Sequence, residues 1–303
     1  MLHADSARNR LAGIAIISLA TLCFSLLDGS AKWLVQTVAI VQVVWLRFLF
    51  QVLVSVVVMA PIQGRRMWRT RAWKLQLLRA TMLGTMTSLN FMALRHLQLA
   101  ETASIMFIAP ILVALLGWRY LDEQLDLGRW LAIIVGFVGV IVILQPGASG
   151  FHPAMLLALG NAVLIAGFGL LSRKLAAIDN PATTQMLSGL GAVVVLAPVA
   201  LWTWLPMPGW LHWVVLIGAS SAAALGHYLL ALSFRYAPAS TLAPFQYLQL
   251  LYMIAIGFVV FGDIPPQQVV VGAAIVIGSG VYLLVRESRV KAVPVAATEP
   301  ARD

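Results

Sequence analysis

The sequence predicts an all-α integral membrane protein of ten transmembrane helices, arranged as two inverted five-helix repeats. Three observations predict this fold. Hydrophobic residues make up 61% of the 303 positions and charged residues only 10%, whereas charged residues form about a quarter of a typical soluble domain. The apolar runs recur about every 20 to 30 residues, the length that crosses roughly 30 Å of hydrocarbon. The two halves of the chain also share similar segments.

The apolar runs are continuous, which favours helices over the short alternating strands of a membrane β-barrel. In lipid, a helix satisfies all of its own backbone hydrogen bonds. We expect the first five spans at residues 11–35, 42–61, 75–94, 100–120 and 128–144. We expect the second five at residues 153–173, 183–205, 212–235, 239–261 and 268–285. The third run is relatively polar, and the fifth and tenth runs are short.

Similar segments about 140 residues apart indicate an internal duplication. Gly117–Glu123 ends one apolar run, and Gly257–Asp263 ends another at an offset of 140 residues. Because five spans is an odd number, the second copy enters the bilayer from the opposite face, an arrangement found in many secondary transporters. We therefore divide the chain into a cytoplasmic N-terminus at 1–10, a first repeat at 11–145, a second repeat at 146–285 and a disordered cytoplasmic tail at 286–303.

Lysine and arginine predict the orientation, because cytoplasmic loops of membrane proteins carry an excess of both. With ten spans, the cationic residues gather in alternate gaps, and the gaps at 145–152, 205–211 and 262–267 contain none. Both termini are then cytoplasmic, in a multi-pass protein of the bacterial inner (cytoplasmic) membrane. The net charge of +9 belongs to these gaps, so we expect no nucleic-acid partner. Cys23 is the only cysteine, which excludes a disulfide framework.

Three stretches carry a resemblance to a known family: Asp28–Lys32 followed by Arg47, Ala109–Glu123, and Pro244–Asp263. In this order and spacing, the chain resembles the ten-helix carriers of the drug/metabolite transporter superfamily, in the branch with two EamA-type domains. The resemblance extends from about Leu11 to Val285. It implies a carrier that moves an amino acid, a vitamin or a nucleotide-like cofactor by alternating access. It also implies a central cavity lined by spans 1, 3, 4, 6, 8 and 9.

Four ionisable residues within or at the ends of the predicted spans are candidates for gating or ion coupling: Asp28, Lys32, Arg47 and Glu101. A charged group at the bilayer centre costs about 2.5–3.5 kcal/mol on insertion scales, so each one is a functional candidate. Asp28 and Lys32 share one helical face, where they can neutralise one another, and Arg47 lies at a depth where it can join them. The alternative is a structural charge cluster. For Glu101 the alternative is a helix cap, which stabilises by a few tenths to about 1 kcal/mol.

The candidate solute contacts are polar or aromatic residues within the predicted spans. They are Gln246, Tyr247, Gln249 and Tyr252 in the ninth span, His227 in the eighth, Ser88 and Asn90 in the third, Asn161 in the sixth and Trp45 in the second. Tyr247 with Gln246 is the preferred pair, because a ring can stack on a solute and an amide can hydrogen-bond to it. Pro244 can open the helix there, since proline lacks a backbone donor. Hydrogen bonds between neighbouring helices are the alternative role for these residues.

The sequence contains no GxSxG turn, HExxH pair, P-loop or metal-spaced cysteine and histidine cluster, so we expect no enzyme activity, metal or cofactor. The expected partners are a small-molecule solute and the lipid bilayer. Alternative functions are efflux of drugs or toxic metabolites, a channel, or a membrane protein that transports nothing. Glycines at helical spacing in the fifth and tenth spans indicate close helix packing: Gly128, Gly136, Gly139, Gly272, Gly278 and Gly280. A monomer is favoured, and a homodimer through these glycines is the alternative.

Overall fold

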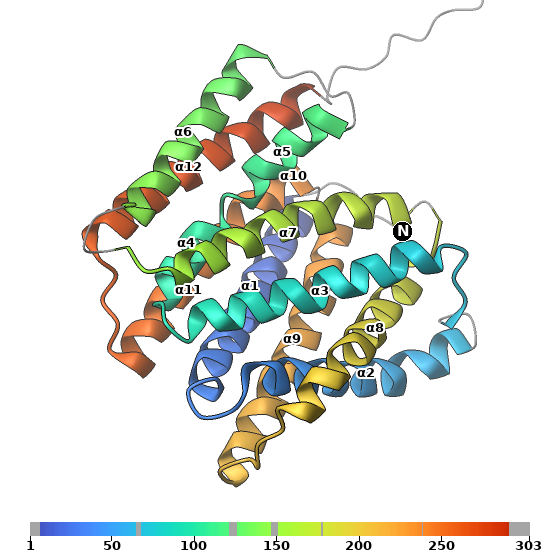
Figure 1. The fold of residues 1–303 in the computed structure, drawn as a ribbon. Helices are drawn as coiled ribbons and strands as arrows, with labels where there is room; N and C mark the ends of the chain where they lie inside the picture. Colours follow the sequence, from blue (N-terminus) through green and yellow to red (C-terminus); the bar gives the residue numbers. More distant parts are fainter. Residues whose placement is uncertain are drawn as a thin grey trace, which may run out of the picture.

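The structure, a computed structural model, describes residues 7–64, 68–120, 126–146, 151–176, 178–237 and 239–290, and within them it is helical with no β-strand (Figure 1). The helices of the first half are α1 (Ala7–Leu34), α2 (Ile40–Gln63), α3 (Trp73–Leu94), α4 (Leu99–Met106), α5 (Ala109–Tyr120) and α6 (Leu127–Leu144). Those of the second half are α7 (Ala154–Ala176), α8 (Pro181–Trp202), α9 (Trp210–Tyr236), α10 (Ala239–Leu242), η2 (Ala243–Tyr247), α11 (Leu248–Ile256), η3 (Gly257–Phe261) and α12 (Gln267–Val290). Most of the predicted tail and of the predicted N-terminal segment lies outside the described residues, as do Asp122 and Glu123.

Eight helical segments of the described chain are long and apolar enough to cross a membrane, and Gln267–Leu283 in α12 is a shorter apolar helix. The protein is therefore a multi-pass membrane protein. The helix α3 is not one of the eight, because its polar residues lower its hydropathy; four of them, Gln76, Arg79, Thr87 and Asn90, are among its ten buried residues. Part of the side that faces the protein is therefore polar, which fits the relative polarity of the third run in the sequence.

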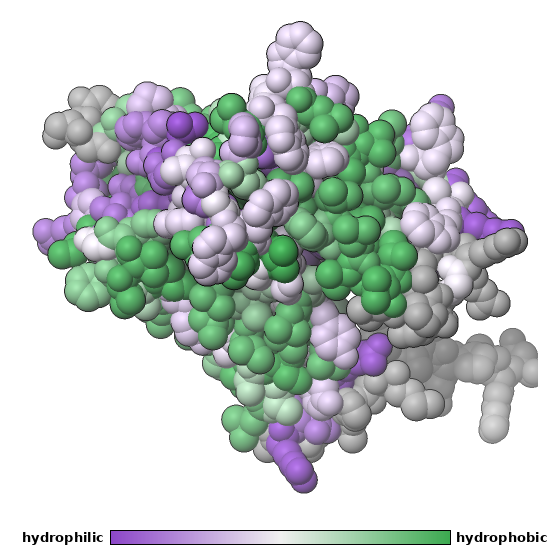
Figure 2. Space-filling model, turned by 90° about the horizontal axis from the view of Figure 1, so that it is seen from below, coloured by the Kyte–Doolittle hydropathy of each residue, from purple (hydrophilic) through white to green (hydrophobic). Residues whose placement is uncertain are grey.

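The outside of the molecule is apolar, as a surface in contact with lipid must be. Leu131, Ile134, Val138 and Ile141 form an exposed stripe along α6, while Val140 and Ile143 on its other face are buried. A helix that is hydrophobic all round is typical of a membrane span. Figure 2 shows apolar side chains over large parts of one face of the molecule, with hydrophilic residues gathered toward its margins.

The fourth and ninth predicted spans are both interrupted beside a proline. In the fourth, α4 ends at Met106 and α5 begins at Ala109, one residue before Pro110. In the ninth, the short α10 leads into the 3₁₀ turn η2, which contains Pro244, and α11 follows. Proline removes a backbone donor and disrupts the regular helical hydrogen bonds. The regular α-helix is interrupted at Pro244, and the interruption is a 3₁₀ turn, which is tighter than an α-helix, in place of the predicted open stretch.

The helices pack so that both halves of the chain contribute to the interior. The helices α1, α11, α4, α7 and α3 form a closed ring of contacts, and α9 packs along α1. On one side of this ring, α2 packs against α8 and α9, and α3 also contacts α8. The helices α6 and α12 run side by side at another edge (Figure 1). The residues that point into the interior of this ring are therefore shielded from lipid.

The contact between α6 and α12 includes two glycines that face each other, and Gly136 of α6 lies against Ser279 of α12. A methyl group on Gly272 would lie 2.7 Å from the backbone oxygen of Gly139 and 2.5 Å from the Cγ1 of Ile143. A methyl group on Gly139 would lie 2.8 Å from Val276. The expected close packing at Gly139 and Gly272 is thus confirmed as a contact within one chain. A methyl group on Gly278 would have no other atom within 4 Å, so Gly278 is not part of this contact.

We expect Gly272→Ala to destabilise the protein by about 1–3 kcal/mol, because the new methyl group meets backbone atoms that cannot move aside. Gly278→Ala is the matched control on the same helix, where the space is open and alanine is the better helix former. Thermal unfolding of both variants in detergent measures the difference. Equal melting temperatures for the two variants would contradict this packing.

Candidate functional site

A cluster of buried polar side chains lies between α1, α2 and α3, and we call Asp28, Arg47, Gln51 and Asn90 the buried polar cluster. All four side chains are buried. The Asn90 side chain donates a hydrogen bond of 3.0 Å from its Nδ2 to the Oδ1 of Asp28. Arg47 lies close enough to Asp28 for its charge to act on the carboxylate. The cluster therefore brings together Asp28, Arg47 and Asn90, three of the residues predicted from the sequence.

Several atoms of this cluster have hydrogen-bonding capacity that the protein does not use. The Nε and Nη1 of Arg47 are buried and have no hydrogen-bond partner among the described residues. The Oε1 of Gln51 and the Oδ1 of Asn90 are likewise buried and have no hydrogen-bond partner among the described residues. The Arg47 guanidinium lies over the ring of Phe48 at 4.5 Å, which compensates part of its charge. A buried donor or acceptor without a partner costs about 1–3 kcal/mol, so this cluster is suited to a ligand.

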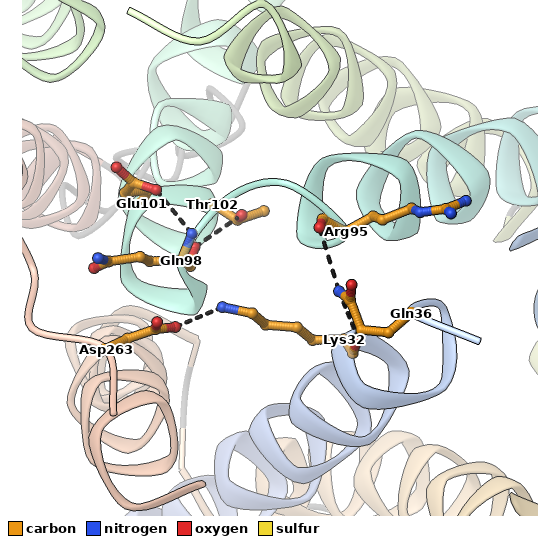
Figure 3. Close-up of polar contacts among 7 residues, drawn as sticks. All are labelled: Lys32, Gln36, Arg95, Gln98, Glu101, Thr102 and Asp263. Carbon is orange, nitrogen blue, oxygen red and sulfur yellow. Dashed lines mark hydrogen bonds and ion pairs between the residues drawn. The ribbon is translucent and has the colours of Figure 1, made fainter. Parts of the chain in front are cut away.

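Lys32 pairs with a residue from the other half of the chain. Its Nζ lies 2.5 Å from the Oδ2 of Asp263, which follows η3, and 4.7 Å from the ring centre of Phe261. Figure 3 shows the two side chains pointing at each other between the end of α1 and the end of η3. The prediction that Lys32 and Asp28 neutralise one another is wrong, because Asp28 points to Asn90. The side chains diverge although they are four residues apart, since each finds a partner on a different helix.

Glu101 lies at the start of α4, near the same end of the molecule (Figure 3). Its Oε2 accepts a hydrogen bond of 2.8 Å from the backbone N–H of Gln98, which is the residue that precedes the helix. This is a capping-box contact, in which a side chain at the third helical position satisfies a free N–H group. The capping role weighed for Glu101 is thus confirmed.

The candidates of the ninth span do not face one common site. Gln246 is exposed, whereas Tyr247 is buried, with its ring 4.8 Å from that of Phe107 and its hydroxyl without a partner among the described residues. Gln249 and Tyr252 are half-buried in α11, and the backbone oxygen of Gln249 accepts a hydrogen bond of 3.3 Å from Ser25. The preferred pair, Tyr247 with Gln246, therefore divides between the interior and the surface.

His227 is half-buried in α9 and connects this helix to the interior. Its ring packs against Phe24 of α1, edge to face, at 5.0 Å. This contact brings a residue of the second half against α1, the helix that contains Asp28.

The remaining candidates are Trp45, Ser88 and Asn161. Their contacts do not identify a solute site. The Nε1 of Trp45 donates a hydrogen bond of 2.9 Å to the backbone oxygen of Val193, which ties α2 to α8. Ser88 donates to the backbone oxygen of Gly84 within its own helix. Asn161 is buried in α7. The hydrogen bonds of Trp45 and Ser88 match the structural alternative that the sequence left open.

Arg79 in α3 is a second buried arginine, and the sequence reasoning missed it. Its Nε donates a hydrogen bond of 3.0 Å to the Oγ of Ser172 in α7, and its Nη1 donates to the Oγ of Ser188 and the backbone oxygen of Thr184 in α8. The guanidinium also lies over the ring of Phe168 at 4.1 Å. The signal was an ionisable residue inside an apolar run, the same signal that identified Arg47.

Asp179, in the turn between α7 and α8, receives hydrogen bonds from the first half of the chain. The donors are the Oγ1 of Thr70, the Nε2 of Gln76 at 2.8 Å and the backbone N–H of Arg71 at 3.2 Å. Burial raises the pKa of the Asp179 carboxyl. The three hydrogen bonds and the charge of Arg71 outweigh this effect, so that the pKa lies below its ordinary value of 3.8. We call Asp179, Thr70 and Gln76 the Asp179 network.

Since its native pKa is lowered, the Asp179 carboxylate stabilises the fold fully above its ordinary pKa, and this stabilisation disappears as the pH falls through the native pKa. We expect Asp179→Asn to melt at a lower temperature than the wild type at about pH 7. The difference between their melting temperatures should become smaller as the pH approaches about 3. Thermal unfolding in detergent across this pH range measures it. A difference in melting temperature that grows as the pH falls would show that the carboxylate is not stabilised in this network.

The profile of the EamA-like transporter family matches this chain twice, at residues 11–145 and 152–286. The chain belongs to the EamA-like transporter family. This confirms its resemblance to the drug/metabolite transporter superfamily. An EamA-like transporter is a membrane transport protein and not an enzyme, and its partners are a small-molecule solute and the membrane.

Known proteins similar to this EamA-like transporter include two curated relatives and a solved structure. A riboflavin transporter of Vibrio cholerae is 29% identical over 80% of this chain and 83% of its own length. An S-adenosylmethionine uptake transporter of Rickettsia bellii is 26% identical over 94% of this chain and 97% of its own length. A crystal structure of a protein 17% identical in sequence covers 93% of this chain and 99% of its own, with a TM-score of 0.64. The last similarity supports the fold.

Proposed function

We propose that this EamA-like transporter moves a small metabolite across the bacterial inner membrane by alternating access. The observation that carries the proposal is the buried polar cluster, in which Asp28 and Arg47 lie inside the membrane-spanning part of a transport protein. A charged residue inside a membrane-spanning segment is a candidate for function, because each one costs free energy to insert. The names of the relatives, for riboflavin and S-adenosylmethionine, support a metabolite as the solute.

The proposal includes ten spans in two inverted repeats, with one monomer as the working unit. The helix α3 is the third span despite its polar face, α4 with α5 is the fourth, α10 to η3 is the ninth, and α12 is the tenth. The matches at 11–145 and 152–286 support the two repeats. Each domain then corresponds to one set of five spans, with a short cytoplasmic segment before the first and a cytoplasmic tail after the second.

The helix contacts support the same symmetry. If the halves are exchanged, α1 takes the place of α7, α3 that of α9, and α2 that of α8. The contact of α1 with α9 then becomes that of α7 with α3, and both are present. The contact of α2 with α9 becomes that of α8 with α3, which is also present. The contacts of α6 with α12 and of α2 with α8 map onto themselves, as a two-fold axis requires.

The loop charges support an orientation with both termini in the cytoplasm. The end of the molecule that contains Lys32 then faces outward, and the end that contains Asp179 faces the cytoplasm. Polar contacts join the halves at each end, and among them we assign Lys32 with Asp263 as the outer lock and the Asp179 network as the inner lock. Opening one lock while the other stays closed gives the solute access from one side at a time. Two repeats that rock around a shared site perform this motion.

Counterflow in proteoliposomes tests the proposed function. Purified protein is reconstituted with unlabelled solute inside, and uptake of the labelled form is followed for riboflavin, S-adenosylmethionine and the amino acids in turn. A carrier exchanges its own solute and saturates with concentration. Uptake that never saturates would indicate a channel, and exchange of none of these solutes would contradict the metabolite assignment. Liposomes with the denatured protein are the control. Uptake and efflux are the same cycle driven by different gradients, so direction is measured with an imposed gradient.

A further inference from the structure

Two aromatic rings touch where the fourth and the ninth spans are interrupted, and we call Phe107 and Tyr247 the central aromatic pair. The two ring centres lie 4.8 Å apart, with the ring planes tilted by 59°. Phe107 is the residue that caps the end of α4, and Tyr247 is the last residue of the 3₁₀ turn η2. Tyr247 is buried and Phe107 is half-buried. Because aromatic pairs in this range attract one another, the two interruptions are joined to each other.

The two rings occupy equivalent positions in the two repeats. The helix α4 begins at Leu99 and α10 begins at Ala239, an offset of 140 residues. Phe107 and Tyr247 are separated by the same 140 positions, and so are the similar segments at the ends of these two spans. Exchange of the two halves therefore puts each ring in the place of the other. Their contact maps onto itself, as do the contacts of α2 with α8 and of α6 with α12.

The central aromatic pair lies near the middle of the bilayer. Phe107 is the ninth residue of the apolar helical segment Leu99–Arg119, and Tyr247 is the ninth residue of the span that begins at Ala239. At 1.5–2.0 Å per residue, each ring lies roughly 12–14 Å along its span, in a hydrocarbon layer roughly 30 Å thick. The outer lock and the inner lock lie at the two ends of the molecule, so this pair is between them.

The surroundings of the pair connect it to most of the interior. Phe107 packs against two hydrophobic clusters, of which one includes residues of α1, α2 and α9 and the other includes residues of α5, α6 and α7. A methyl group on Gly280 of α12 would overlap the hydroxyl of Tyr247, so the lack of a side chain there leaves room for this ring. Close-packed interiors transmit displacements from one element to the next. A tilt of either half is therefore felt at this pair.

Symmetry distinguishes the contacts that an inverted-repeat carrier can keep from those that it breaks. In the proposed cycle, the inward-facing state is the outward-facing state with the conformations of the two halves exchanged. Lys32 with Asp263 becomes a contact at the opposite end of the molecule under this exchange, so it can be made in one state and broken in the other. The central aromatic pair becomes itself, so its geometry is the same in both states.

We propose that the central aromatic pair is the pivot of the transport cycle: its rings stay in contact while the outer lock and the inner lock open in turn. Phe107 and Tyr247 are then positioning residues, which hold the two halves together at the midplane so that opening at one end closes the other. This inference rests on the proposed transport function with its two inverted repeats, and it adds the residues about which the repeats rock.

A crosslink within the pair tests whether the rings stay together. Phe107→Cys and Tyr247→Cys are combined with Cys23→Ser in the full-length protein, and a short, cleavable thiol crosslinker joins the two sites in proteoliposomes. Counterflow uses the probe that the wild type exchanges among riboflavin, S-adenosylmethionine and the amino acids. We expect the crosslinked protein to exchange this probe within about twofold of the untreated variant. Exchange that stops on crosslinking and returns on cleavage would overturn the pivot, whereas a wild type that exchanges no probe would contradict the transport function itself.

Truncation of one ring separates a pivot from a merely structural contact, and this test needs no crosslink. Without the ring of Phe107 the two locks are no longer linked, so both open together part of the time and the probe leaks. In Phe107→Ala we expect the ratio of net efflux to exchange to rise about 2- to 10-fold, the fold change for the loss of one aromatic contact. A loss of folded protein lowers both rates equally and leaves this ratio unchanged.

Phe91→Ala is the matched control, since Phe91 is a buried phenylalanine of α3 outside the central aromatic pair. We expect it to lower the melting temperature and to leave the ratio as in the wild type. If Phe107→Ala does not fold, Phe107→Leu provides the same measurement with a smaller change in volume. A ratio that stays unchanged in the Phe107 variant, or that rises equally in Phe91→Ala, would show that the pair only packs the interior.

Discussion

Lys32→Glu will reduce solute exchange at least about tenfold, and adding Asp263→Lys to it will restore much of the loss. The single variant places two carboxylates where an ammonium and a carboxylate now lie 2.5 Å apart. Like charges at this separation repel, and residues in one ion pair show coupling energies of about 0.5–3 kcal/mol in double-mutant cycles. The lock at this end then fails to close, which leaves the transporter with access from one side only. The reversed pair restores the attraction with the two charges exchanged.

Counterflow in proteoliposomes, at matched amounts of folded protein, measures this effect. Lys74→Glu is the control. Lys74 is an exposed lysine beside Trp73 at the start of α3, and it belongs to neither lock. A double variant no more active than the two single variants would show that the ion pair does not contribute to transport.

Asp28→Asn will abolish exchange while the protein still folds into the membrane. Asparagine has nearly the same shape as aspartate, so packing against Asn90 is preserved. Among the described helices, Asp28 is the one buried carboxylate, and its charge acts on Arg47. Removing one partner from a buried charge pair costs about 3–5 kcal/mol, since the other charge is left uncompensated.

Exchange and thermal stability measured together separate these effects. Ser18→Ala is the control on α1, since Ser18 donates only to the backbone oxygen of Ile14 in its own helix. We expect that control to transport normally. Normal exchange rates in Asp28→Asn would remove Asp28 from the transport mechanism.

Local features of the structure could be predicted from the sequence because the residues that form them are neighbours along the chain. The helix cap of Glu101 requires only Gln98, three residues earlier. The break at Pro244 follows from a missing backbone donor. The apolar runs likewise locate the helices, because crossing a bilayer fixes both their length and their composition.

The pairing of distant residues could not be predicted in the same way. Lys32 and Asp263 lie 231 positions apart, and their contact depends on how the two halves pack. The nearer carboxylate, Asp28, was the obvious partner by sequence distance, yet it faces a different helix. Tyr247 and Gln246 are adjacent in sequence but differ in exposure, because successive side chains of a helical turn point about 100–120° apart around its axis. Arg79, by contrast, could have been found, since it lies inside a predicted span.

Reversible crosslinking across the outer lock tests the central claim most directly, namely that the two halves must separate there for the solute to pass. Cysteines replace Lys32 and Asp263 in a chain where Cys23→Ser removes the only native cysteine. A short, cleavable thiol crosslinker then joins them in proteoliposomes. We predict that exchange stops when the two sites are joined and returns when the crosslink is cleaved, with the untreated double variant as the reference. Full exchange through the crosslinked protein would contradict the proposed mechanism.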